Sequence, residues 1–268
     1  MQHSPSRAAS SRAAFTLVEM AIVITIIGLI IGGVLAGQSL LNNSKLDAVM
    51  TDLRKYKAAV VQFRQQYGGY PGDIADATDY WGSDSNCPYS GSDSTPKTVT
   101  CNGDGNGSIG IHTNEESRAW QQLADAGLIT GSYSGFYSAS YNYDWMVAGK
   151  NAPAGPHEGS AYVLYWLPTV LAGYNWAVYD GNMGTLLYYG AMQTNSLPQG
   201  PILTSAEASA IDRKVDDGKP GTGVIQTDRG IGNGFYCTTD QNEADGATAA
   251  YNTSATGKIC DIFYQIDW

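Results

Sequence analysis

The chain has 268 residues, of which 43% are hydrophobic and 15% charged, and its formal net charge is −10. That length accommodates one sizeable domain with a packed core plus a short appended segment. The acidic balance disfavours nonspecific binding to nucleic acid, because phosphates are neutralised by lysine and arginine.

The first 14 residues are polar, carry Arg7 and Arg12, and end in the small residues Ala13 and Ala14. An ordinary signal peptide places its small residues after the apolar run rather than before it. Cleavage after Ala14 would therefore leave the apolar run on the mature protein. The alternative is a signal anchor that keeps its leader.

Residues 15–37 form an apolar run with one ionisable side chain, Glu19. As a helix, these roughly 23 residues span about 34 Å, enough to cross a bilayer core of about 30 Å. A carboxylate in such a segment costs on the order of 2.5–3.5 kcal/mol and needs a partner. Glycines fall at interleaved four-residue spacings, which favours close helix packing, although glycine is also common in membrane helices; they are Gly28, Gly32, Gly33 and Gly37.

Residues 38–70 predict an amphipathic continuation of the same helix. Its apolar positions recur at steps of three and four residues. No proline occurs between Phe15 and Tyr70, so one helix of roughly 50 residues is expected. The predicted stop is Gly68-Gly69, with Pro71 beyond. The apolar positions are Leu46, Val49, Met50, Leu53, Tyr56, Val60, Phe63 and Tyr67.

The string AFTLVEM resembles the N-terminus of type IV prepilins and type II secretion pseudopilins. In that family the leader ends in Gly or Ala, Phe usually follows, and a Glu stands four residues further on; here these are Ala14, Phe15 and Glu19. The resemblance implies cleavage by a prepilin peptidase, N-methylation of Phe15, and pairing of Glu19 with the Phe15 amine of a neighbouring subunit. The alternative for Glu19 is a tolerated polar residue in an anchor. The later string QQYGGYPGD resembles the helix exit of these proteins.

Residues 71–268 predict a globular α+β head. Residues 72–113 are rich in Gly, Ser, Asp, Asn and Thr and are expected to be irregular. A helix follows, with a capping-box pattern at Thr113-x-x-Glu116 and a stop at Gly127 or Gly131. A second helix is predicted at Ser205–Val215, with Thr204 and Glu207 as its cap.

Three aromatic and β-branched runs predict an antiparallel meander packed on the amphipathic helix. They are Ala161–Leu167, Tyr174–Tyr179 and Thr185–Met192. An apolar strand is expected within Ile259–Trp268. The fold class is therefore α+β and pilin-like: a long N-terminal helix, membrane-spanning and then amphipathic, on an antiparallel sheet with long disulfide-pinned loops.

The even cysteine count beyond a membrane segment favours two disulfides in an oxidising compartment. Three pairings are open, and sequence proximity favours Cys87–Cys101 and Cys237–Cys260. Each would close a loop of roughly 15–25 residues, which contributes about 3 kcal/mol in the chain-entropy model. A metal site is the rival interpretation, but no CxxC motif occurs.

Two segments are candidate calcium sites. Asn102, Asp104 and Asn106 alternate like the first half of an EF-hand loop, but the twelfth loop position is Thr113, so Glu115 or Glu116 could substitute only along a different loop path. A plain turn is the alternative. The second set is Asp212, Asp216 and Asp217; C-terminal calcium is common in major pseudopilins, whereas surface carboxylates without metal are the favoured interpretation.

No enzyme signature is present, so no catalytic residue is expected. We interpret the chain as a structural subunit of a type IV pilus or type II secretion pseudopilus: residues 1–14 leader, 15–37 transmembrane and assembly helix, 38–70 amphipathic continuation, 71–268 head. The resemblance implies the bacterial inner membrane with a periplasmic head, then an extracytoplasmic filament of pilin-like subunits built on an assembly platform. The alternatives are a minor tip-located adhesin or ligand-binding module, and a signal-anchored enzyme without a motif.

Overall fold

The computed structural model describes residues 16–85, 87, 98–110, 113–136, 146–167, 179, 183–193, 196–228, 236–239 and 246–267. The chain divides into two units, residues 1–44 and 45–268. The second unit contains the sheet and the shorter helices.

Helix α1 (Leu17–Tyr67) is the single long helix that the sequence predicts. It ends where Gly68 adopts a left-handed φ of 81°, a conformation that glycine reaches without steric cost. Within the second unit, one face of α1 is buried, and its residues include the predicted apolar stripe; they are Leu46, Val49, Met50, Leu53, Tyr56, Ala59, Val60 and Phe63.

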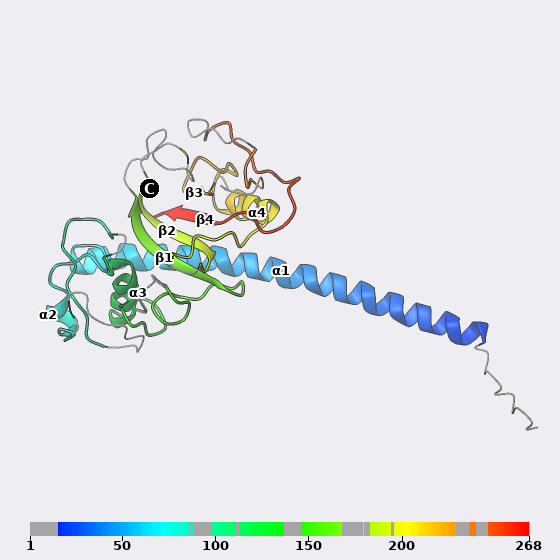
Figure 1. The fold of residues 1–268 in the computed structure, drawn as a ribbon, viewed down its shortest axis with the longest axis horizontal. Helices are drawn as coiled ribbons and strands as arrows, with labels where there is room; N and C mark the ends of the chain where they lie inside the picture. The colour runs from blue at the N-terminus through cyan, green and yellow to red at the C-terminus, as the bar shows by residue number, and fades with distance from the viewer. Residues whose placement is uncertain are drawn as a thin grey trace, which may run out of the picture. The chain divides into compact units, whose positions relative to one another are not determined.

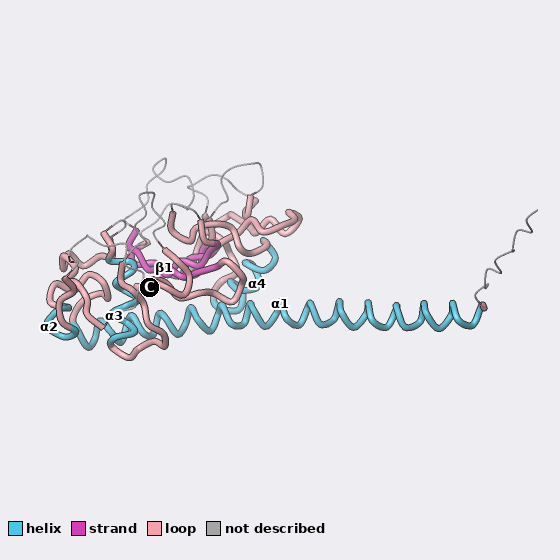
Figure 2. Tube along the Cα trace, turned by 60° about the horizontal axis from the view of Figure 1, so that its bottom comes forward, coloured by secondary structure: helices cyan, strands magenta, loops and turns pink. Residues whose placement is uncertain are grey.

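The sheet has four antiparallel strands in the order β1-β2-β4-β3. The strands are β1 (Ser160–Leu167), β2 (Gly184–Ala191), β3 (Ile225–Gln226) and β4 (Ile262–Gln265). Figures 1 and 2 both show the sheet beside the part of α1 that belongs to the second unit. The expected antiparallel sheet is confirmed.

The expected meander order is wrong. The first and third predicted runs pair directly, with Tyr162 opposite Tyr189 and Leu164 opposite Leu187. The C-terminal strand β4 then lies between β2 and β3. The middle run, residues 174–179, lies outside the described residues except for Tyr179. Spacing along the chain predicts strands but not which strands become neighbours, because a long connection lets distant strands pair.

The core of the second unit joins α1, α3 (Glu115–Asp125) and the sheet through aromatic contacts. The Tyr56 ring lies 5.0 Å from Trp120 of α3 and 5.1 Å from Tyr162 of β1, both edge-to-face. Such geometry adds about 0.5–1.5 kcal/mol per pair beyond burial. Tyr56 therefore packs α1 against both α3 and β1.

The helices of the head correct the sequence-based expectations in two places. α2 (Ala77–Trp81) is a short helix within the segment expected to be irregular. The capping box at Thr113 is wrong: α3 is preceded by Asn114 with a left-handed φ of 67°, and the Asn114 side chain does not cap the helix. The Thr113 hydroxyl donates to the Gly110 carbonyl at 3.0 Å and accepts from the Glu115 amide at 3.4 Å, not from the Glu116 amide that a capping box would use. The predicted helix α4 (Ser205–Val215) and its Thr204–Glu207 capping box are both present.

Asp267 ties the C-terminal segment to α1 and β2. Its Oδ1 accepts from Arg64 Nη1 at 2.7 Å and also from the Tyr70 hydroxyl. Its Oδ2 accepts from the Thr185 amide at 3.1 Å. Arg64 and Asp267 are 203 positions apart in the chain, so their ion pair holds the C-terminal segment against α1.

Candidate functional site

Three carboxylates meet at the loop of residues 102–107. Asp73, Asp104 and Glu115 each offer a carboxylate oxygen, and these oxygens all lie within 4.8 Å of one another. Asp73 and Glu115 are buried, whereas Asp104 is exposed. Burial, together with the charge of Glu115, raises the pKa of Asp73 to about 6. The cluster therefore concentrates negative charge in a place where protons or cations are favoured.

Backbone amides hold the loop around this cluster. The two Asp73 oxygens accept from the Asn106 and Gly107 amides, each at 3.0 Å. Glu115 Oε1 accepts from the Asp104 amide at 3.2 Å, and its Oε2 accepts from the Gly110 amide at 2.7 Å. A Cβ on Gly103 would lie 2.3 Å from the Asp73 backbone, so this close approach needs glycine.

Of the three residues predicted in this loop, only Asp104 belongs to the carboxylate cluster. Asn102 Oδ1 accepts from the Thr78 amide at 2.8 Å and so faces α2. Asn106 Nδ2 donates to Asp104 Oδ2 at 2.8 Å, while its Oδ1 accepts from the Ser108 amide. Asp73, which precedes Asp104 by 31 residues in the sequence, completes the cluster. The cluster therefore does not follow the ligand spacing of an EF-hand loop.

A second carboxylate cluster is formed at the end of α4. Asp212, Asp216 and Asp217 offer oxygens within 4.8 Å of one another. Asp212 is fully buried and accepts from the Tyr251 hydroxyl at 2.8 Å and from the Gly218 amide at 3.0 Å. Burial and the neighbouring aspartates raise the pKa of Asp212 to about 7, despite these two bonds.

Asp216 and Asp217 are engaged with the loop that follows α4. Asp216 Oδ2 accepts from the Val224 and Ile225 amides, the latter at 3.1 Å. Asp217 accepts from the Lys219 amide at 2.8 Å and from the Thr222 hydroxyl at 2.6 Å. In both clusters the donor set is oxygen only, which suits a hard cation such as Ca²⁺ better than zinc.

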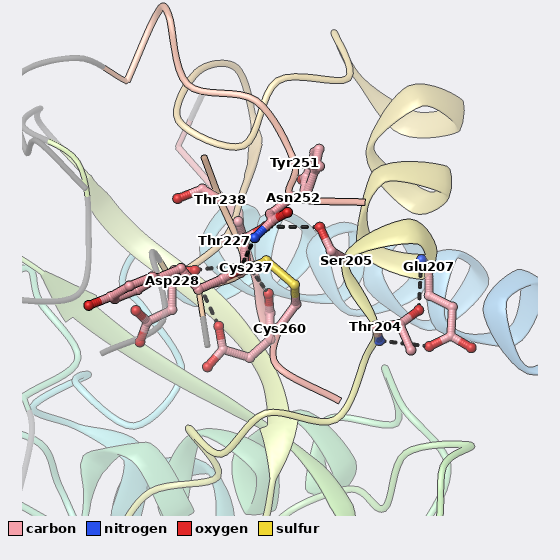
Figure 3. Close-up of a disulfide and its surroundings, with 12 residues drawn as sticks. Thr204, Ser205, Glu207, Thr227, Asp228, Cys237, Thr238, Tyr251, Asn252 and Cys260 are labelled. Carbon is pink, nitrogen blue, oxygen red and sulfur yellow. Dashed lines mark hydrogen bonds between the residues drawn. A yellow bond between two sulfur atoms is a disulfide. The ribbon is translucent and has the colours of Figure 1, made fainter. Parts of the chain in front are cut away.

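The structure joins Cys87 to Cys101 and Cys237 to Cys260, the pairing that sequence proximity favours. Figure 3 shows the Cys237–Cys260 disulfide near Ser205 at the start of α4. The Cys237 carbonyl accepts from the Ser205 hydroxyl at 2.8 Å, and the Cys260 carbonyl accepts from the Leu203 amide at 2.8 Å. This disulfide therefore links the 236–239 segment to the start of α4 and to β4.

At the N-terminus of α1, Glu19 closes a capping box with Thr16. The Thr16 amide and hydroxyl donate to Glu19 Oε2 at 2.8 and 2.9 Å, and the Glu19 amide donates to Thr16 Oγ1 at 3.2 Å. The carboxylate thus satisfies donors that would be unpaired at a helix start. Sequence reasoning missed Thr16, although Thr16-x-x-Glu19 is the same pattern that predicts the cap of α4.

The apolar side chains of residues 17–41 are exposed in the first unit, from Leu17 at 91% to Met20 at 46%. A Cβ added to Gly28, Gly32, Gly33 or Gly37 would meet no atom within 4 Å. α1 is long and apolar enough to cross a membrane. So large an apolar surface needs lipid or other helices to cover it.

Residues 9–35 match the prokaryotic N-terminal methylation motif. This is the prepilin-type cleavage and methylation segment of type IV pilins and pseudopilins. No curated protein and no solved structure is significantly similar to the chain. Ala14 and Phe15, the residues expected at the cleavage point, lie outside the described residues.

The prepilin-type segment supports a pilin-like or pseudopilin subunit in general. It implies processing by a prepilin peptidase and polymerisation with other pilin subunits, and it points to a structural subunit rather than an enzyme. Together with the apolar helix it fits membrane anchoring and an extracytoplasmic filament. Glu19 lies inside this segment, and the two carboxylate clusters belong to the head.

Proposed function

We propose that this protein is a structural subunit of a type IV pilus or a type II secretion pseudopilus. It is processed after Ala14, held in the inner membrane with its head in the periplasm, and polymerised through its N-terminal helix. The observation that carries the proposal is the prepilin-type segment at residues 9–35 on an exposed apolar helix with Glu19 near its start.

Processing is tested by intact mass and N-terminal sequencing of the protein from its own membranes. We expect a mature chain that begins at an N-methylated Phe15. Replacing Phe15 or Ala14 by a bulky charged residue should leave the leader attached. A mature protein that begins at Met1, or after Gly37, would overturn the proposal.

Assembly is tested by Glu19→Gln, which keeps the shape of the side chain but removes its charge. In lipid the carboxylate is favoured only when paired, so pairing with a neighbouring Phe15 amine drives docking in one register. We expect normal processing and membrane insertion but at least tenfold fewer sheared filaments. A tenfold loss corresponds to about 1.4 kcal/mol of lost pairing free energy. Thr25→Ala is the matched control, because the Thr25 hydroxyl donates to the Ala21 carbonyl of its own helix.

A minor tip-located adhesin or ligand-binding subunit is the alternative, supported by the size of the second unit, residues 45–268. Abundance separates the two. A shear fraction made mostly of this chain would exclude the tip subunit, whereas trace amounts beside a more abundant pilin would exclude the main structural role.

The calcium expectation becomes a proposal for the head: Ca²⁺ binds at Asp73, Asp104 and Glu115, and a second ion binds at Asp212, Asp216 and Asp217. The support is chemical. Both sets gather oxygen ligands, and burial raises the pKa of Asp73 and Asp212, so a divalent cation would offset like charges that now lie close together.

Thermal unfolding with calcium and with a chelator tests both sites. At a free calcium concentration 100 times the Kd, we expect each bound ion to stabilise the protein by about 2.7 kcal/mol, a rise in Tm of roughly 5–10 °C per site. Asp73→Asn and Asp212→Asn should each remove part of that rise, and the exposed Glu158→Gln should remove none. Equal midpoints with calcium and with chelator would exclude both sites.

A further inference from the structure

Aromatic and acidic side chains gather where α1 ends and α2 begins. Tyr80 is 51% exposed, and its ring and that of Trp81 lie 5.0 and 5.1 Å from Tyr67. Asp76 and Asp79 are exposed on the same short segment. We call Tyr67, Asp76, Asp79, Tyr80 and Trp81 the α2 patch.

The carboxylates of the α2 patch have no cation beside them in the described part of the chain. The ion pairs found there join Arg64 to Asp267 and Lys214 to Asp47. Asp76 makes no side-chain cap at the start of α2. Aromatic faces and free carboxylates both attract cations. The patch therefore fits a basic partner that also presents some apolar surface.

The outer face of α1 offers that combination. Arg54, Lys55, Ala58 and Val61 are all exposed, and positions 54, 58 and 61 follow one another along one side of the helix. Neither of the two ion pairs above involves Arg54 or Lys55. We call these four residues the α1 basic face.

The α1 basic face and the α2 patch cannot meet within one chain. Tyr67 follows Arg54 by 13 positions, which is about 20 Å along the helix and about 140° around it. Two complementary surfaces on different sides of one subunit form heterologous contacts. Such contacts build rings or open filaments rather than closed dimers.

We propose that the α1 basic face of one subunit binds the α2 patch of a second copy of this chain. Arg54 and Lys55 then lie against Asp76 and Asp79, and Ala58 and Val61 cover the exposed tyrosine ring. This contact rests on the proposed polymerisation and adds a head-to-head interface to the packing of the N-terminal helices. It orients each subunit about its own helix axis.

Charge reversal in the full-length chain, expressed in its own host, tests the contact. Arg54→Glu with Lys55→Glu, or Asp76→Lys with Asp79→Lys, should each reduce the sheared filament fraction at least tenfold. The four changes combined should restore it to within about threefold of the wild type, because the opposite charges face one another again. The exposed Lys150→Glu is the control and should change nothing.

A covalent probe gives a second measurement. Ala58→Cys and Tyr80→Cys in one chain should yield a ladder of crosslinked subunits on mild oxidation, and each single variant should yield at most dimers. Reversed charges without effect, a combination as poor as its parts, or the lack of a ladder would overturn the contact. If the wild type formed no filaments, the proposed function would be wrong. The contact would still be tested by oxidising the double-cysteine subunits in the membrane and looking for the crosslinked ladder.

Discussion

At the scale of single residues, the Glu19 carboxylate is engaged within its own chain, and the proposed pairing with a neighbouring Phe15 amine would use the same group. Within a chain its Oε2 already accepts two bonds from Thr16. This local bonding lowers the cost of holding a carboxylate in lipid before assembly. Pairing with a neighbouring amine would then add to the capping box or replace it. Thr16 is thus a positioning residue for Glu19.

Asp125 provides a residue-scale prediction of pH dependence. It is the last residue of α3, its Oδ2 is buried without a hydrogen-bond partner among the described residues, and burial raises its pKa to about 6. The folded state therefore holds the Asp125 proton more tightly than the unfolded state does. Stability from this group is present below the unfolded pKa of about 3.8 and is lost as pH rises through about 6.

Asp125→Asn should therefore stabilise the protein at pH 7.5, where the wild-type carboxylate is charged near the negative end of the helix. With partial exposure discounted, we expect about 1 kcal/mol, or a Tm higher by about 2–4 °C. At pH 3.5 the two proteins should unfold together. The exposed Glu158→Gln should shift neither midpoint. An equal gain at both pH values would assign the effect to something other than charge.

At the scale of elements, the two capping patterns of the head have different outcomes. Thr204 caps α4 through the Glu207 amide at 3.2 Å, and Glu207 Oε2 accepts from the Thr204 amide at 2.8 Å. Thr204→Ala should cost about 1 kcal/mol of unfolding free energy, since the Glu207 amide loses its acceptor, whereas the backbone amide of residue 204 can still donate to Glu207 Oε2.

Chemical denaturation monitored by tryptophan fluorescence measures that cost. Thr204→Ser retains the hydroxyl and should unfold close to the wild type, within a few tenths of a kcal/mol. If the alanine and serine variants were equally destabilised, packing of the threonine methyl rather than capping would explain the loss.

At the scale of the whole molecule, the two disulfides differ in access. Cys237 and Cys260 are both 0% exposed, whereas Cys87 is half-buried beside the buried Cys101. Thiol–disulfide exchange requires a thiolate to reach a sulfur atom. Mild reductant without denaturant should therefore open Cys87–Cys101 first.

Alkylation followed by peptide mapping checks this order. Label should accumulate on Cys87 and Cys101 while Cys237 and Cys260 stay unlabelled until the head unfolds. In the chain-entropy model each closed loop contributes about 3 kcal/mol, so early loss of the first disulfide lowers Tm without unfolding the protein at 25 °C. Equal labelling of all four cysteines in the native protein would contradict the prediction.

The features that depend on near neighbours in the chain were predictable. Hydrophobic periodicity and the lack of proline predicted α1, Gly68-Gly69 predicted its end, and the Thr204–Glu207 pattern predicted α4. Proximity favoured both disulfide pairs, because short loops close most readily. The prepilin-type segment is equally local, since leader, Phe15 and Glu19 lie within a few residues of one another.

Only the tertiary structure brought Asp73 to Asp104 and Glu115, paired β1 directly with β2, and joined Asp267 to Arg64. Each of these contacts depends on the path of the chain between distant positions, which no local pattern encodes. The Thr113 pattern failed because α3 starts one residue later than the pattern predicts, after Asn114 in a left-handed conformation, so Thr113 and Glu116 are not at the capping positions. The sequence by itself determined the long apolar helix and its prepilin-type segment, and the fold decided which residues of the head lie together.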